Sequence, residues 1–232
     1  MTDFWDEPEG IAPRGTVIVA AGRGETTGVY ARFGRRIAAD GYRVRVLPDV
    51  TADLPASLAA AEKLLVDDSL PGPRVVAGSD TGALFALALA RRAVPGLDGL
   101  VLAGLPGSPA RPSAVVDLAT FDLSGLEAEV EARTACPNHQ RVLSGGASLF
   151  SAPIPTELIE PTGYGSIPTL GVHGGADTIS PLQAVRYPGA PVVIEGGRHD
   201  ILNDVTHRTV AALIVLFLEK LRNGAEIVRA TA

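Results

Sequence analysis

Short runs of consecutive apolar residues alternate with longer segments of helical spacing along most of the chain. Runs of this kind, rich in β-branched residues, are typical of strands that a parallel sheet buries on both faces. We expect strands over residues 16–21, 42–47, 74–77, 100–103, 168–173 and 190–195. We expect helices over residues 27–40, 54–67, 83–93 and 203–222. The alternation predicts an α/β fold with one doubly wound, mostly parallel sheet of about six strands and helices on both faces.

Two segments depart from this pattern. Residues 108–166 hold one amphipathic stretch, 123–135, followed by sequence rich in Pro, Ser and Gly. We expect this region to be a lid inserted over the sheet edge, with one to three helices. Residues 1–14 are acidic and Pro-rich, and we expect a loosely packed arm. The chain thus reads as one domain over 1–232, with its core at 15–107 and 167–222.

Composition narrows the class of protein. A length of 232 residues with 46% hydrophobic content suits one domain with a sizeable core. The net charge of −6 argues against a nucleic-acid partner. The lone cysteine, Cys136, allows no internal disulfide and fits a reducing compartment. We see no signal peptide and no apolar run long enough to span a membrane, so we expect a cytoplasmic protein.

A sharp turn joins the strand at 74–77 to the helix that follows it. Gly78 and Gly82 flank Asp80 in the sequence Gly-Ser-Asp-Thr-Gly. Small residues on both sides of a central residue, between a strand and a helix, are the sequence form of a nucleophile elbow. Serine is the usual central residue of such a turn, so Asp80 is the unusual feature of this chain. Taking Ser79 as the nucleophile instead would move both glycines off the positions where the turn needs them.

Two more strands end in residues that can do chemistry. Asp177 follows the strand at 168–173, and His199 follows the strand at 190–195. Ligands bind at the carboxyl ends of strands in open α/β sheets, so we expect both residues to converge with Asp80. Asp177 would hold one ring nitrogen of His199 and leave the other to act as a base.

These motifs, in this order, resemble the α/β-hydrolases, and most of all the compact lysophospholipase or monoglyceride-lipase branch. The resemblance rests on residues 20–25, 78–82, 173–177 and 197–199. It implies an oxyanion hole formed by the backbone N–H groups of Arg23 and Thr81. Gly22, Ser79 and His139 are our candidates for lining a substrate pocket, and the alternative for His139, in the insertion, is an exposed loop histidine. Ala21 stands where that branch has histidine, and Asp80 where it has serine.

The aspartate leaves three interpretations open. Asp80 could be a covalent nucleophile, a general base or orienting group, or a sign that activity is lost. Attack by a carboxylate on an sp³ carbon gives an ordinary ester, whereas attack on a carboxylic ester gives a high-energy anhydride. Covalent catalysis therefore favours an epoxide, a halide or another alkyl electrophile. Epoxide hydrolases and haloalkane dehalogenases hold the leaving group with Trp or paired Tyr side chains. The insertion of this chain offers only one such side chain, Tyr164, near its end, so neither signature is present.

Electrostatics adds an expectation for the histidine. Two carboxylates flanking His199 would raise its pKa and make it a poor base for water but a competent acid. We expect His173 to be structural, Cys136 to pack in the interior, and His207 to lie on a solvated helix face. The sequence predicts a hydrolase of a small uncharged molecule, with no metal or organic cofactor. The alternative is a protein of the same fold that binds a ligand or partner without hydrolysis.

Overall fold

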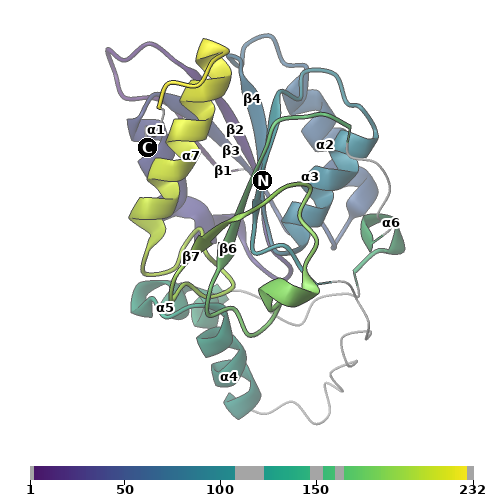
Figure 1. Cartoon of the computed structure of the whole chain (residues 1–232), viewed down its shortest axis with the longest axis vertical. Helices are drawn as coiled ribbons and strands as arrows, with labels where there is room; N and C mark the ends of the chain where they lie inside the picture. Colours follow the sequence, from purple (N-terminus) through teal and green to yellow (C-terminus); the bar gives the residue numbers. More distant parts are fainter. Residues whose placement is uncertain (1–2, 108–122, 147–153, 160–164, 229–232) are drawn as a thin grey trace.

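The computed structural model describes residues 3–107, 123–146, 154–159 and 165–228, and in this part of the chain one seven-stranded sheet forms the centre (Figure 1). Its strands are β1 (Asp3–Trp5), β2 (Gly15–Ala20), β3 (Tyr42–Leu47), β4 (Arg74–Ser79), β5 (Gly99–Ala103), β6 (Thr169–Gly174) and β7 (Val192–Ile194). Their order across the sheet is β1-β3-β2-β4-β5-β6-β7. All neighbouring pairs are parallel except β1 with β3. The doubly wound, mostly parallel sheet expected from the sequence is confirmed.

Helices cover both faces of the sheet (Figure 1). The longer ones are α1 (Ala31–Ala39), α2 (Leu54–Leu65), α3 (Thr81–Arg91) and α7 (His207–Asn223). Two 3-10 turns, η1 (Thr27–Tyr30) and η2 (Leu182–Ala184), lie in the connections. Alternate strand residues face α1 and α7 on one side and α2 and α3 on the other. Because both faces are buried, the strands read as continuous apolar runs in the sequence.

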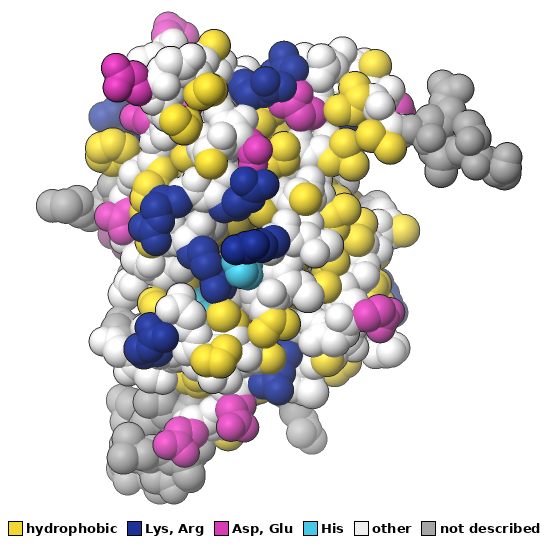
Figure 2. Space-filling model, turned by 90° about the vertical axis from the view of Figure 1, so that its left-hand side faces the viewer, with side chains coloured by type: hydrophobic (Ala, Val, Ile, Leu, Met, Phe, Trp, Pro, Cys, Tyr) yellow, Lys and Arg dark blue, Asp and Glu magenta, His cyan; other side chains and the backbone are white. Residues whose placement is uncertain are grey.

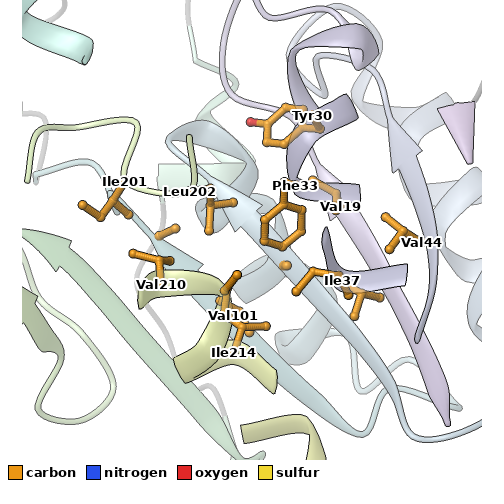
Figure 3. Packing of buried hydrophobic residues seen from close by; sticks show 14 of the residues in the cluster. Val19, Tyr30, Phe33, Ile37, Val44, Val101, Ile201, Leu202, Val210 and Ile214 are labelled. Atoms are coloured by element: carbon orange, nitrogen blue, oxygen red, sulfur yellow. The ribbon is translucent and has the colours of Figure 1, made fainter. Parts of the chain in front are cut away.

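The core beneath α1 and α7 shows how these layers are held together (Figure 3). Phe33 and Ile37 of α1 pack in one cluster with Val19 of β2, Val101 of β5 and Ile214 of α7. These side chains are at most 3% exposed. Each stabilises the fold by roughly 1.5–3 kcal/mol relative to an exposed position, so the sheet is a rigid support for residues at its strand ends.

The expectation of a loose N-terminal arm is wrong. Residues 3–5 form β1, which pairs with β3 so that Trp5 lies opposite Val44. The Trp5 ring packs against Gly34, where an added Cβ would lie 2.1 Å from the ring. Ion pairs fasten the segment to β3, among them Arg43 with Glu7 at 2.8 Å and Arg45 with Asp6 at 2.7 Å. Among the described residues, the sheet therefore has six parallel strands and one antiparallel edge strand.

The predicted insertion contributes three helices to the described part of the chain, the upper end of the expected range. They are α4 (Leu123–Arg133), α5 (Pro137–Gly146) and α6 (Thr156–Ile159). The predicted lid residues at 108–122, 147–153 and 160–164 lie outside the described residues. The corner between α4 and α5 is fixed to the core, because Thr134 and the Ala135 N–H both donate to Asp204, at 2.9 and 2.8 Å.

An arginine side chain also connects α1 to the α4–α5 corner and to the segment before α7. Figure 2 shows Lys and Arg side chains gathered around a histidine on the α1 and α7 side of the molecule. Arg32 of α1 reaches Sγ of Cys136 at 3.2 Å and donates to the carbonyl of Asn203. Burial first, and Arg32 second, lower the pKa of His207.

Within the described ranges, the helices are all too short or too polar to cross a bilayer.

Candidate active site

The turn between β4 and α3 has the geometry of a nucleophile elbow. Asp80 sits between the two elements with φ 50° and ψ −122°, a strained conformation for a residue other than glycine. A Cβ at Gly78 would lie 2.0 Å from the carbonyl oxygen of Gly82, and a Cβ at Gly82 would lie 2.1 Å from that of Ala20. Both clashes are with backbone, so the turn requires glycine at these positions. Ser79 is the buried last residue of β4, and Asp80 occupies the apex.

The acid and the histidine predicted from the sequence meet Asp80 at the ends of β6 and β7. Asp177 accepts hydrogen bonds from the N–H groups of Ile179 and Ser180, both 2.9 Å, through Oδ1. Its other oxygen, Oδ2, lies 2.8 Å from Nδ1 of His199. Nε2 of His199 lies 3.5 Å from Oδ1 of Asp80. All three of these interacting side chains are buried.

The loop after β2 supplies a backbone donor to the same carboxylate. The N–H of Arg23 donates to Oδ2 of Asp80 at 3.1 Å. Glu25 fixes this loop by accepting from the N–H of Gly22 at 2.9 Å. Gly22 lies against the elbow, because a Cβ there would be 3.2 Å from that of Asp80. The predicted Arg23 donor thus points at Asp80.

Thr81 is the second predicted donor, and its placement differs. It begins α3 directly after Asp80 and is fully buried. Among the described residues, we find no hydrogen bond from its backbone N–H to the Asp80 carboxylate, and its buried hydroxyl has no partner there.

Burial and neighbouring charges set the protonation states of the pair. Burial favours neutral Asp80, but the His199 contact and the Arg133 guanidinium outweigh it and hold the Asp80 pKa well below its usual range. Burial also favours neutral His199, but the Asp177 and Asp80 carboxylates outweigh that and raise its pKa to about 10. At neutral pH the resting site is therefore a buried ion pair of carboxylate and imidazolium, as the sequence predicted for a histidine between two carboxylates.

Arg133 is a site residue that sequence reasoning missed. It ends α4, is 1% exposed, and places Nη2 3.7 Å from Oδ2 of Asp80. Its other nitrogens lie 3.2 Å from Oδ1 of Asp200 and 3.0 Å from Oε1 of Glu129. The sequence offers only the spacing of Glu129 and Arg133 as a helix pair, which gives no sign of the approach to Asp80.

Glu25, His139 and Asp200 form a second buried cluster beside the first. One possible ligand atom from each lies within 4.8 Å of the others, which is close enough to hold a metal ion. The three groups already have partners: Nε2 of His139 lies 3.0 Å from Asp200, Arg133 pairs with Asp200, and Tyr30 donates to Glu25. Burial raises the pKa of Glu25 to about 7. The cluster is satisfied by hydrogen bonds and ion pairs alone.

His139 is a buried member of this second cluster. It is 2% exposed on α5 and faces Asp200, so the interpretation as an exposed loop histidine is wrong. His173 is structural, as expected: it is fully buried, and Nδ1 lies 2.9 Å from the hydroxyl of Tyr187. Burial lowers the pKa of His173. Cys136 is buried, which confirms its packing role.

Comparison with solved structures identifies the fold that carries this site. No protein-family model and no curated protein sequence matches the chain. A solved structure of a putative non-heme bromoperoxidase from Mycobacterium tuberculosis is similar, with a TM-score of 0.71, 16% identity, and coverage of 95% of this chain and 96% of that one. A soluble variant of monoglyceride lipase from Saccharomyces cerevisiae, in complex with a substrate analog, is also similar, with a TM-score of 0.68, 16% identity and coverage of 95% and 91%. The enol-lactonase from Burkholderia xenovorans has a TM-score of 0.64 at 16% identity over 94% and 96%. These structures share one fold, and this chain has it: the α/β-hydrolase fold.

Proposed function

We propose that the protein is a hydrolase that acts on a small uncharged molecule through a covalent ester of Asp80. The observation that carries this proposal is the difference between the two oxygens of the Asp80 carboxylate. Oδ2 accepts the Arg23 N–H, while Oδ1 faces Nε2 of His199. One oxygen is anchored as in an oxyanion hole, and the other is directed at the acid–base residue.

The first step uses the ion pair as it stands. Oδ1 of Asp80 attacks an sp³ carbon, a new C–O bond forms, and the bond from carbon to the leaving group breaks. A leaving oxygen takes the Nε2 proton of the His199 imidazolium, whereas a halide leaves as the anion and the Nε2 proton is lost to water. Asp177 holds Nδ1 throughout and fixes the ring orientation.

The second step restores the carboxylate. Neutral His199 takes a proton from water, and the water oxygen attacks Cγ of Asp80, so negative charge develops on Oδ2 beside the Arg23 N–H. Collapse expels the product alkoxide, which takes the proton of His199 and leaves as the alcohol, and the proton left on the Asp80 carboxyl then passes to His199. The net reaction is R–X plus water to R–OH plus HX.

The high pKa of His199 fits this sequence of steps. An imidazolium is the right form for the first step and the wrong one for the second. Ester formation removes the Asp80 charge, which is one of the causes of the raised pKa. The histidine therefore becomes a better base at the point where a base is needed.

The substrate class follows from the nucleophile. The similar structures carry the names monoglyceride lipase, thioesterase and enol-lactonase, which describe acyl compounds. A carboxylate nucleophile would turn such a compound into an anhydride. We therefore favour an epoxide or an alkyl halide over a carboxylic ester for this chain.

A single turnover in ¹⁸O-water tests the proposal. Enzyme in excess is mixed with an epoxide, a primary alkyl bromide or a carboxylic ester. The mass of the peptide that contains Asp80 is then measured by mass spectrometry. We expect one ¹⁸O in the Asp80 carboxylate with the epoxide or bromide. The variant His199→Gln should trap the alkyl ester with the bromide, because bromide leaves without a proton. Label in the product but not in Asp80 would instead assign Asp80 the role of general base.

The buried ion pair also favours a second candidate, a protein that binds a ligand without hydrolysis. A carboxylate and an imidazolium that neutralise each other are a stable arrangement in the absence of any reaction. This candidate predicts no turnover, no label and no trapped ester across the three substrates.

A further inference from the structure

Each of the three nitrogens of the Arg133 guanidinium faces an acidic side chain. Its Nε faces Glu129, its Nη1 faces Asp200, and its Nη2 faces Asp80. Taking a guanidinium out of water costs several kcal/mol unless it is well paired. The contact with Asp200 lies in the interior and provides one such pair. The contact with Asp80 links the buried cation to the elbow itself.

Arg133 acts on one particular oxygen of that carboxylate. Nη2 approaches Oδ2 at 3.7 Å, the oxygen that also accepts the Arg23 N–H at 3.1 Å. Oδ1 is left to His199 at 3.5 Å. In the described part of the chain the Thr81 N–H makes no hydrogen bond to this carboxylate, and the neighbours that Oδ2 shows are the Arg23 N–H and the Arg133 guanidinium.

The α4–α5 corner fixes Arg133 relative to the histidine loop. The N–H of Asp200, the residue after His199, donates to the Arg133 carbonyl at 2.9 Å. Asp200 in turn is held by His139 at 3.0 Å. The guanidinium and the imidazole are therefore positioned by the same loop. Such fixed charges stabilise a transition state without reorganisation.

We propose that Arg133 is a charged member of the oxyanion hole and that it acts on the breakdown of the Asp80 ester. This role rests on the proposed function. At rest the Asp80 carboxylate carries a full negative charge. In the alkyl ester the group is neutral, and negative charge develops again on Oδ2 when water attacks. Arg133 therefore stabilises the starting carboxylate, which slows alkylation, and stabilises the second transition state, which speeds ester hydrolysis.

The two opposite effects give a sharp test. Arg133→Gln is mixed with a primary alkyl bromide, and the Asp80 ester is followed over time by intact-protein mass. We expect alkylation as fast as in the wild type or faster, and ester breakdown slower on the order of 10²- to 10³-fold, so the ester accumulates. Arg141→Gln, the same change at an exposed arginine of α5, should leave both rates unchanged.

Separate control experiments test whether the variant folds and whether the proposed function holds. If Arg133→Gln does not fold, as judged by circular dichroism, Arg133→Lys replaces it, and we expect slower ester breakdown because a single ammonium cannot serve Asp200 and Asp80 together. Ester breakdown at the wild-type rate in either folded variant would overturn the role of Arg133 while leaving the proposed function intact. Absence of any Asp80 ester in the wild type, in His199→Gln and in Arg133→Gln would overturn the proposed function, and this role with it.

Discussion

Nε2 of His199 lies 3.5 Å from Oδ1 of Asp80, and both side chains are buried. Because Asp177 occupies Nδ1 at 2.8 Å, the imidazole is held between two carboxylates. A positive charge placed this way is stabilised by both neighbours, and it helps to hold the pKa of Asp80 below its usual range despite burial.

The first prediction concerns the titration of this histidine. In the wild type, NMR of the imidazole nitrogens should show His199 protonated across neutral pH, with a pKa of about 10. Asp80→Asn removes one of the two carboxylates, so the pKa should fall towards the ordinary value of 6.5. A wild-type His199 that titrates at or below that value would mean that the two carboxylates do not both flank it.

The same pair predicts a pH dependence of stability. The raised pKa of His199 contributes stability that is full below pH 6.5 and is lost as pH rises through about 10. The lowered pKa of Asp80 contributes stability that is present above its ordinary value of 3.8 and is lost in acid. Urea unfolding should therefore show the largest advantage of the wild type over Asp80→Asn near pH 4–6.5, shrinking towards pH 10. An advantage that grows from pH 7 to pH 10 would contradict this sign.

The elbow glycines predict a large and local effect on stability. Alanine at Gly78 or Gly82 would place a Cβ 2.0 or 2.1 Å from a backbone oxygen. Since backbone cannot move aside as a flexible side chain can, we expect each change to destabilise the protein by about 3 kcal/mol or more in urea unfolding. The control is Gly145→Ala in α5, where an added Cβ meets nothing within 4 Å. There we expect stabilisation of roughly 0.5–1 kcal/mol.

The sequence predicted the parts of the fold that depend on local pattern. The strands and the elbow have strong signals, because buried runs and obligatory glycines leave few alternatives, as β3 over Tyr42–Leu47 illustrates. β1 was missed because three residues, Asp3–Trp5, are too short to show a period, and its pairing depends on Trp5 packing against Gly34. No local pattern could reveal these tertiary contacts.

The candidate site divides in the same way. Asp177 and His199 follow strands and so could be placed at the sheet edge from sequence alone. Arg133 could not, because its contact with Asp80 requires knowing how α4 packs on the histidine loop. His139 was considered as an exposed residue for the same reason: only the fold of α5 turns it towards Asp200.

Asp177→Asn tests the orienting role of the acid. The amide oxygen of asparagine can still accept from Ile179 and Ser180, so the turn should persist. Its NH₂ would then face Nδ1 of His199, and the histidine would lose its acceptor. We expect turnover to fall on the order of 10³- to 10⁴-fold with little change in Tm. Asp68→Asn, at an exposed aspartate before β4, is the matched control and should keep full turnover. Full turnover in Asp177→Asn would remove Asp177 from the mechanism.

Asp80→Ser asks whether the surrounding machinery can serve another nucleophile. A serine at the apex of the elbow would present its hydroxyl towards Nε2 of His199 and leave the Arg23 N–H free for a substrate oxyanion. Loss of the Asp80 charge also removes one cause of the raised His199 pKa, while burial still favours the neutral imidazole. The histidine would then be neutral at pH 7–8 and able to act as a base for serine. We expect a gain of esterase activity on short p-nitrophenyl esters, measured by release of p-nitrophenol, that Asp80→Ala lacks. Equal rates in the serine and alanine variants, both folded, would show that Asp177, His199 and Arg23 do not form a working acyl-transfer site.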